Sequence, residues 1–159
     1  MGMKNLKFVE YSIVFQEVPD EISLVFTISN CPYKCDGCHS KYLWEDNGFN
    51  LLENLDNILN NYKDLITCVC FMGGDQNESE LNKAIDIVRK YNIKTCLYTG
   101  SDDLYKFNNI IDSLNYIKIG RYIKELGGLD SINTNQIFYK NNDGNLEDIT
   151  YLFRKENQQ

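Results

Sequence analysis

Three cysteines stand close together in the segment Cys31-Pro32-Tyr33-Lys34-Cys35-Asp36-Gly37-Cys38-His39, with three and then two residues between them. Cysteine thiolates are the usual ligands of iron–sulfur clusters, and a 4Fe–4S cluster normally takes four of them. We find no fourth cysteine near this segment. The spacing therefore predicts a 4Fe–4S cluster in which one iron has no protein ligand. An open position on a metal is typical of sites that perform chemistry.

Two other metal chemistries would use the same residues. The stretch Cys35-Asp36-Gly37-Cys38-His39 matches the haem-attachment pattern C-x-x-C-H. Attachment of that haem requires export, however, and it would leave Cys31 without a role. A zinc ion bound by the three cysteines and His39 would need two adjacent ligands, whereas structural zinc sites normally use two separated pairs. These chemistries are the alternatives to the iron–sulfur cluster.

The composition is that of an ordinary globular protein of one domain: 159 residues, 43% hydrophobic and 25% charged. The formal net charge is −7 and Lys and Arg do not cluster, so we expect no direct contact with nucleic acid. No apolar run approaches the roughly 20 residues of a membrane helix, and the N-terminal residues do not resemble a signal peptide. We therefore expect a cytoplasmic protein without a membrane contact. In that compartment clustered cysteines indicate metal or redox chemistry.

Strand and helix patterns alternate along the chain and must position the cysteines. Asn77 and Glu80 have the spacing of a capping pair, and the turn sequence at 141–144 predicts a hairpin. Short connections between alternating elements favour right-handed βαβ units and a parallel sheet. Apolar periodicity predicts strands at 22–28, 67–72, 93–98 and 116–119, and helices within 51–66, 81–91 and 104–114.

The loops after parallel strands meet at one edge of the sheet, where α/β proteins bind their ligands. Each predicted strand is followed by residues able to bind a ligand, so we expect one shared rim. Cys68, Cys70 and Cys96 lie within the predicted strands instead and should be small buried residues. The four rim segments are Cys31 to His39, Gly73-Gly74-Asp75, Thr99-Gly100 and Gly120-Arg121.

The cysteine segment resembles the signature of the radical S-adenosylmethionine (SAM) superfamily, in which CxxxCxxC follows the first strand of a βα domain. The form CPYKCDGCH, with Gly37 and His39 around the third cysteine, is similar to the activases of anaerobic ribonucleotide reductase. One departure is the stretch 17–21, which stands where many relatives carry Gly-Pro-Gly. The resemblance covers most of the chain, since it extends to QEVPDEISLVFTIS at 16–29, CHSKYLWED at 38–46, ITCVCFMGGD at 66–75, YIKIG at 116–120 and TNQ at 134–136.

This resemblance implies a fold and a site. The fold would be α/β, a shortened open (βα) partial barrel with a mostly parallel sheet. It would form a single domain over 1–159, with a core at about 20–122 and a C-terminal extension at 123–159. Cys31, Cys35 and Cys38 would hold the 4Fe–4S cluster, whose fourth iron would bind SAM. The residues implied to bind SAM are Gly73, Gly74, Asp75, Thr99, Lys118, Tyr33, Gly37 and His39.

The implied SAM contacts have different physical grounds. Gly73 and Gly74 allow a ligand to approach the backbone closely. Asp75 stands where the superfamily has Glu, and its carboxylate would pair with the SAM ammonium group. Thr99 would bind the ribose or carboxylate of SAM, or else cap the next helix. Lys118 would pair with the SAM carboxylate, or extend to water from the end of its strand.

The activity that the resemblance implies is activation of a glycyl-radical enzyme. An electron from a flavodoxin or ferredoxin would cleave SAM, and the 5′-deoxyadenosyl radical would take a hydrogen from a glycine of the partner. That partner would be the large subunit of anaerobic ribonucleotide reductase, which would cover the open side of so small a domain. The alternatives are activation of another glycyl-radical enzyme, a small-molecule radical SAM reaction, and a non-catalytic iron–sulfur or zinc module.

Overall fold

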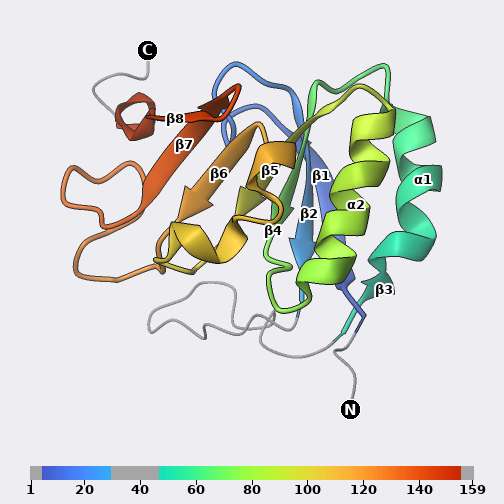
Figure 1. The fold of residues 1–159 in the computed structure, drawn as a ribbon, viewed down its shortest axis with the longest axis horizontal. Coiled ribbons are helices and arrows are strands. Elements are labelled where there is room, and N and C mark those ends of the chain that lie inside the picture. The colour runs from blue at the N-terminus through green and yellow to red at the C-terminus, as the bar shows by residue number, and fades with distance from the viewer. Residues whose placement is uncertain (1–4, 30–46, 155–159) are drawn as a thin grey trace.

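The computed structural model describes residues 5–29 and 47–154, which form one eight-stranded sheet with two α-helices on one face (Figure 1). The strand order is β3-β1-β2-β4-β5-β6-β7-β8. The strands are β1 (Lys7–Val14), β2 (Ser23–Ile28), β3 (Phe49–Asn50), β4 (Cys68–Met72), β5 (Lys94–Tyr98), β6 (Tyr116–Ile119), β7 (Ile137–Asn142) and β8 (Asn145–Asp148). The helices are α1 (Leu51–Tyr62) and α2 (Glu78–Lys90), with short 3-10 helices η2 (Leu104–Phe107), η3 (Ile111–Ser113) and η4 (Thr150–Phe153).

The sheet is mixed, and this overturns the predicted (βα) partial barrel with a mostly parallel sheet. β2, β4, β5 and β6 are parallel to one another. The pairs β1–β2, β1–β3, β6–β7 and β7–β8 are antiparallel, so antiparallel pairs are the majority among the described strands. The described residues also form two α-helices where three were predicted. None of the described helices has the length and apolarity that crossing a membrane requires.

Local sequence explains these differences. β1, KFVEYSIV, is half exposed and mixes polar with apolar residues, so its apolar pattern is weak. Asp143 and Gly144 both have positive φ angles, 52° and 96°, and make the predicted tight turn that sends β8 back along β7.

In the stretch 104–114 the chain forms η2 and η3 instead of one helix. Asn108, Asn109 and the residues around them favour turns over helix interiors.

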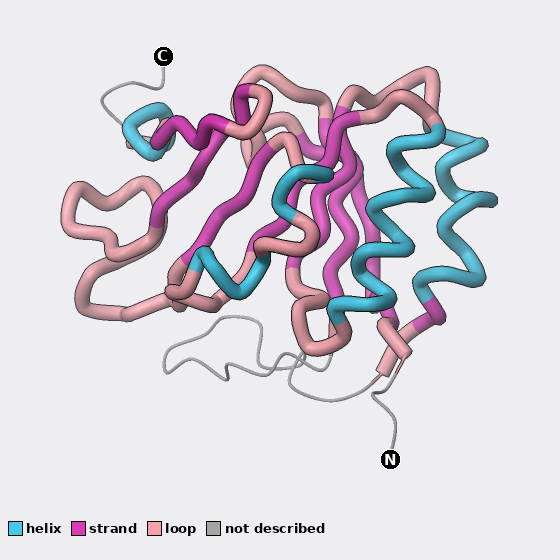
Figure 2. Tube along the Cα trace, in the orientation of Figure 1, coloured by secondary structure: helices cyan, strands magenta, loops and turns pink. Residues whose placement is uncertain are grey.

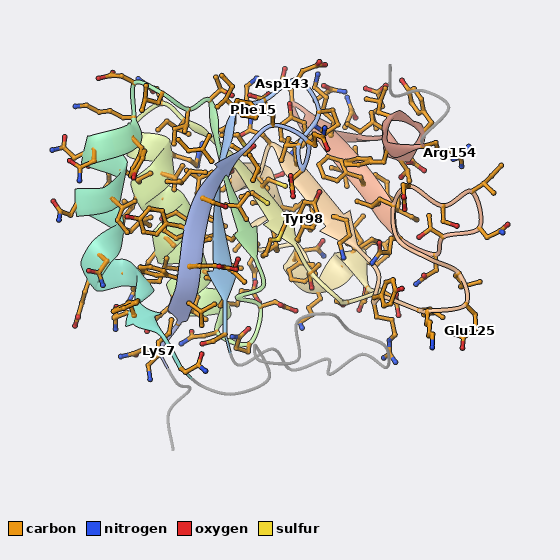
Figure 3. All side chains as sticks on the ribbon, turned by 180° about the vertical axis from the view of Figure 1, so that it is seen from behind. Lys7, Phe15, Tyr98, Glu125, Asp143 and Arg154 are labelled. Carbon is orange, nitrogen blue, oxygen red and sulfur yellow. The ribbon has the colours of Figure 1, made fainter. Side chains whose placement is uncertain are left out.

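Both faces of the parallel strands are buried. The apolar stripes predicted for 51–66 and 81–91 pack α1 and α2 on one face, against strand residues such as Phe26 and Phe71. Asn77 caps α2 as predicted by accepting the Glu80 N–H, and the Glu80 carboxylate accepts the N–H of Leu6. The other face, seen in Figure 3, carries the second core cluster: Val18, Val25, Cys68, Cys70, Cys96, Tyr116, Phe138, Ile149 and Phe153, with Tyr98 packed against it.

The connection between β1 and β2 crosses this second face and is fixed there by buried polar contacts. The Tyr98 hydroxyl donates to the carbonyl oxygen of Glu17. The Glu21 carboxylate accepts from Tyr116 at 2.6 Å and from Lys94 at 2.9 Å, and Glu21 is only 6% exposed. Burial alone would raise the pKa of Glu21, but hydrogen bonds from Tyr116 and Lys94 outweigh it and lower the pKa.

We predict that Glu21→Gln destabilises the fold at neutral pH by about 1–2 kcal/mol, because a charge-assisted pair of hydrogen bonds is lost. The pKa of Glu21 in the folded chain lies below its ordinary value of 4.5. Its stabilisation is therefore complete above that value and is lost as the pH falls through the lower, folded pKa. Urea unfolding followed by circular dichroism should show a smaller difference from the parent at about pH 3.5 than at pH 7. The control is Glu53→Gln, at an exposed position of α1. An equal loss of unfolding free energy in both variants would contradict the prediction.

Candidate functional site

The four parallel strands end in one row, which places the loops that follow them on a common rim, at the lower edge of Figure 1. The register pairs Thr27 with Met72, Met72 with Tyr98, and Tyr98 with Lys118. Hydrogen bonds continue past the strand ends, from Gly73 N–H to the Tyr98 carbonyl and from Thr99 N–H to the Lys118 carbonyl, each at 2.9 Å. The rim loops are therefore held to one another by backbone contacts.

The cysteine segment is attached to this rim at both of its ends. Cys31, Tyr33, Cys35, Gly37, Cys38 and His39 lie outside the described residues, and Ser29 and Asn47 are the described residues nearest to them on either side. The Ser29 hydroxyl donates to the Asn47 carbonyl and accepts the Asn47 N–H at 3.3 Å. The two described residues that flank the cysteine segment therefore meet at one point of the rim.

Gln76 joins this point to the Gly73-Gly74-Asp75 turn. Its side-chain amide donates to the Ser29 carbonyl at 2.9 Å, and its oxygen accepts the Gly74 N–H at 3.2 Å. Gly73 and Gly74 have φ angles of 102° and 111°, which residues with a Cβ rarely adopt. A Cβ on Gly73 would stand 3.3 Å from the Ile28 side chain. Gly73 thus lets the turn lie directly against the end of β2, and Gly74 lets it pack against Leu81 and Leu6.

The carboxylate of Asp75 lies inside the rim, with its side chain 1% exposed. Its Oδ2 accepts from the Thr99 hydroxyl at 2.9 Å, and the Lys106 ammonium lies 3.4 Å away. Thr99 also accepts the Ser101 N–H, whereas η2 is capped by Asp103. The alternative that Thr99 caps the next helix is therefore wrong. Thr99 instead links Asp75 to the loop after β5.

Lys118 lies at the end of β6 and is 8% exposed, so its side chain does not extend to water. Its ammonium donates to the carbonyl oxygens of Thr99 and Gly120, at 3.1 and 3.0 Å, and lies 5.6 Å from the Tyr98 ring centre. The Gln136 amide donates to the same Gly120 oxygen at 3.3 Å. This cation is therefore held in a buried position by backbone oxygens and an aromatic face.

Three polar residues of the rim were not predicted as site residues: Gln76, Lys106 and Gln136. Gln76 contacts Ser29, which is 47 positions away in the chain, and Gln136 contacts Gly120, which is 16 positions away. No local sequence pattern reveals such contacts. Gln136 does belong to the TNQ segment at 134–136 that carries the resemblance. Lys106 has the sequence context of an ordinary surface lysine. Nothing in the sequence of the Gly73-Gly74-Asp75 turn indicates that the Lys106 ammonium of η2 lies beside Asp75.

Cys68, Cys70 and Cys96 are free thiols on the second face of the sheet, and all three are fully buried, as predicted. Cys70 and Cys96 are direct neighbours on β4 and β5. Burial raises the pKa of the Cys68 and Cys96 thiols, so these groups stay protonated. A metal ligand must be a thiolate. Within residues 5–29 and 47–154 no group of His, Cys, Asp or Glu side chains is arranged to hold a metal ion.

We predict that anaerobic reconstitution gives about four irons and four sulfides per chain. Cys31→Ala, Cys35→Ala and Cys38→Ala should each abolish most of this iron content, because each removes a thiolate ligand. Cys68→Ala, Cys70→Ala and Cys96→Ala serve as matched controls and should keep it. Metal and sulfide analysis reads the result directly. One zinc per chain without sulfide would contradict the iron–sulfur prediction in favour of the zinc alternative.

Comparison with known proteins bears on the cysteine segment and on the sheet that carries it. The model of the family described as the 4Fe–4S single cluster domain matches residues 22–130, which is more than half of the chain. The matched region begins just before β2, includes the three clustered cysteines and ends after β6. No curated protein and no solved structure matches the sequence. The match confirms the predicted iron–sulfur chemistry, and the chain belongs to the 4Fe–4S single cluster domain family.

Proposed function

We propose that the chain is a radical SAM activase that generates a glycyl radical on the large subunit of anaerobic ribonucleotide reductase. The observation that carries this proposal is the connection made by Gln76. It ties the Gly73-Gly74-Asp75 turn to Ser29, two residues before Cys31. A carboxylate suited to an ammonium group thus stands beside the entrance to the cysteine segment.

The chemistry of the rim suits a ligand that carries both an ammonium and a carboxylate, as SAM does. The Asp75 carboxylate has the Lys106 ammonium 3.4 Å away, so an ammonium group is a suitable partner for it. Lys118 offers a buried positive charge on the neighbouring strand end. Gly73 and Gly74 adopt positive φ angles and so form the tight turn that places Asp75 on the rim. These features support SAM as the second cofactor.

Cys31, Cys35 and Cys38 would hold the cluster, which would supply the single electron that cleaves the bond from sulfur to the 5′ carbon of SAM. The products would be methionine and a 5′-deoxyadenosyl radical able to take a hydrogen atom from the partner's glycine. Flavodoxin or ferredoxin is the proposed source of this electron. The proposed compartment is the cytoplasm. The described residues contribute position and charge. Asp75 would hold the ammonium group, and Thr99 would act through Asp75, because its hydroxyl hydrogen is already donated there.

The packing of the sheet supports a macromolecular substrate. The face away from the helices is filled by buried side chains, among them Val18, Cys70 and Cys96. A substrate would therefore have to approach the rim at the edge of the sheet. A glycine on a loop of another protein can reach such an edge. This favours activation of a glycyl-radical enzyme over a small-molecule reaction.

We predict that Asp75→Asn weakens SAM binding to the reconstituted protein by about 1.5–3 kcal/mol, or roughly 10- to 150-fold, because a charged hydrogen bond is lost. The amide keeps the size of the side chain and its acceptor for Thr99. Equilibrium dialysis gives the dissociation constant, and iron content should not change. Asp86→Asn, on the exposed side of α2, should bind SAM like the parent. Unchanged affinity in Asp75→Asn would remove Asp75 from the SAM site.

We predict further that the chain, SAM, a reductant and the reductase large subunit together yield a glycyl radical, seen as a doublet in electron paramagnetic resonance. Deuterium on the α-carbon of the partner's glycine should appear in 5′-deoxyadenosine, since that carbon is the hydrogen donor. Cys31→Ala should give neither product, whereas Cys68→Ala should give both. SAM cleavage without deuterium transfer or a radical would exclude the activase and favour a small-molecule substrate. Absence of SAM cleavage with an intact cluster would favour a non-catalytic iron–sulfur module.

A further inference from the structure

A groove of about 540 Å³ lies between η2, η3 and the hairpin of β7 and β8. We call it the η2–β8 groove. It exists because the chain forms only short helical turns over β5 and β6, next to the full helix α2 (Figure 2). A helix over 104–114 would have covered this part of the sheet. Its floor is formed by the apolar residues Leu104, Tyr105, Ile111, Ile137, Tyr139 and Leu146.

The floor is accessible to another molecule. Tyr105 is 80% exposed, the largest exposed fraction among the large hydrophobic side chains described. Leu104, Ile111, Ile137 and Leu146 are each partly exposed. Large aromatic side chains that project into solvent beside apolar neighbours are typical of protein contact sites. The groove therefore has the apolar centre that a docking segment needs.

The charges around the groove are all negative. Asp102, Asp103 and Asp112 line it and are exposed, and no Lys or Arg is among the described residues that line it. A larger cavity of about 690 Å³, at the opposite ends of the parallel strands, differs in this respect. It is lined by residues of both signs, among them Glu21 and Lys94. The charged residues that line the η2–β8 groove thus have one sign, whereas those of the larger cavity have both.

The groove and the rim share η2. Leu104 and Tyr105 of this helix line the groove, while Lys106 of the same helix lies 3.4 Å from the Asp75 carboxylate. Asp102 follows directly after Ser101, whose carbonyl accepts the Gly120 N–H on the rim. A segment lying in the groove would therefore end beside the rim residues. This position suits the part of a substrate protein that holds its reacting loop in place.

We propose that the η2–β8 groove docks a segment of the partner protein in which Lys or Arg side chains flank apolar residues. The inference rests on the proposed activase function, because it assigns the groove to the same partner. Charge complementarity identifies the occupant: three aspartates around an apolar floor attract a basic, apolar segment. A second copy of this chain is a poor occupant, since each chain carries a net charge of −7.

The test measures binding of the purified reductase large subunit to the reconstituted holoprotein. The charge variant is Asp102→Asn/Asp103→Asn/Asp112→Asn, in which the amide oxygen introduced at position 103 keeps the acceptor that caps η2. Its binding should be about tenfold weaker than the parent's in about 50 mM salt and nearly equal to it in about 300 mM salt, because exposed charges are screened. The apolar variant, Tyr105→Ser, should bind several-fold more weakly at both salt concentrations. Tyr105 is exposed enough for this truncation to leave the fold intact.

The matched control is Glu53→Gln/Asp64→Asn/Asp86→Asn, which removes the same charge from exposed positions in α1, the loop after it and α2. It should bind within about twofold of the parent, since those positions lie away from the groove. All variants should cleave SAM at the parent rate when the partner is absent.

The outcomes separate this proposal from the function it rests on. Parent-like binding by both groove variants, with a glycyl radical still formed, overturns the groove and leaves the activase function intact. If the parent neither binds the large subunit nor forms the radical, the proposed function fails and the docking assignment fails with it. If the parent instead self-associates, and Tyr105→Ser abolishes this self-association, the occupant of the groove is a second copy of the chain. That result would overturn the proposal of a basic partner segment.

Discussion

The register of the parallel strands is the constraint on which the site depends. β4 lies between β2 and β5 with Met72 level with Thr27 and Tyr98, and β6 adds Lys118 to the same row. Because side chains alternate across a strand, a slip of one residue in β6 would turn Lys118 toward the helices and remove it from the rim. The backbone hydrogen bond from Gly120 to the Ser101 carbonyl, at 2.7 Å, fixes the row beyond the strands. The positions of all rim side chains follow from this one alignment.

The alignment places two buried charges on one rim, which would be costly without compensation. Asp75 is compensated by the Thr99 hydroxyl and the Lys106 ammonium, and Lys118 by the carbonyls of Thr99 and Gly120. Thr99 therefore serves both charges, through its hydroxyl and through its carbonyl. Such an arrangement holds an anion and a cation on the same rim, each with its own partners. It also means that substitution of Thr99 would disturb the surroundings of both charges.

The sequence allowed prediction of those features that depend on local pattern. Two of these features follow from apolar runs: the strand at 116–119 and the buried cysteines. The other two follow from residues adjacent in the chain: the Asn77 cap and the turn at Asp143. The mixed sheet was missed because β1 is half exposed and its antiparallel pairing with β2 leaves no periodic signal. The rim partners were missed for a related reason. Gln76 and Lys106 meet Ser29 and Asp75 only after the sheet has brought distant segments together.

The face of the sheet away from the helices is closed by its own packing. Tyr98 fills the centre of the second face, its hydroxyl is bound to the carbonyl of Glu17, and Val18 is fully buried beside it. The connection between β1 and β2 thus contributes Val18 to the second core cluster and is bound to β5 and β6 through Glu17 and Glu21. Within the described chain, η2 connects the rim to the surface beside it, because Lys106 lies 3.4 Å from the Asp75 carboxylate while Leu104 and Tyr105 line the η2–β8 groove. A molecule that occupied this groove would therefore lie next to the buried charges of the rim.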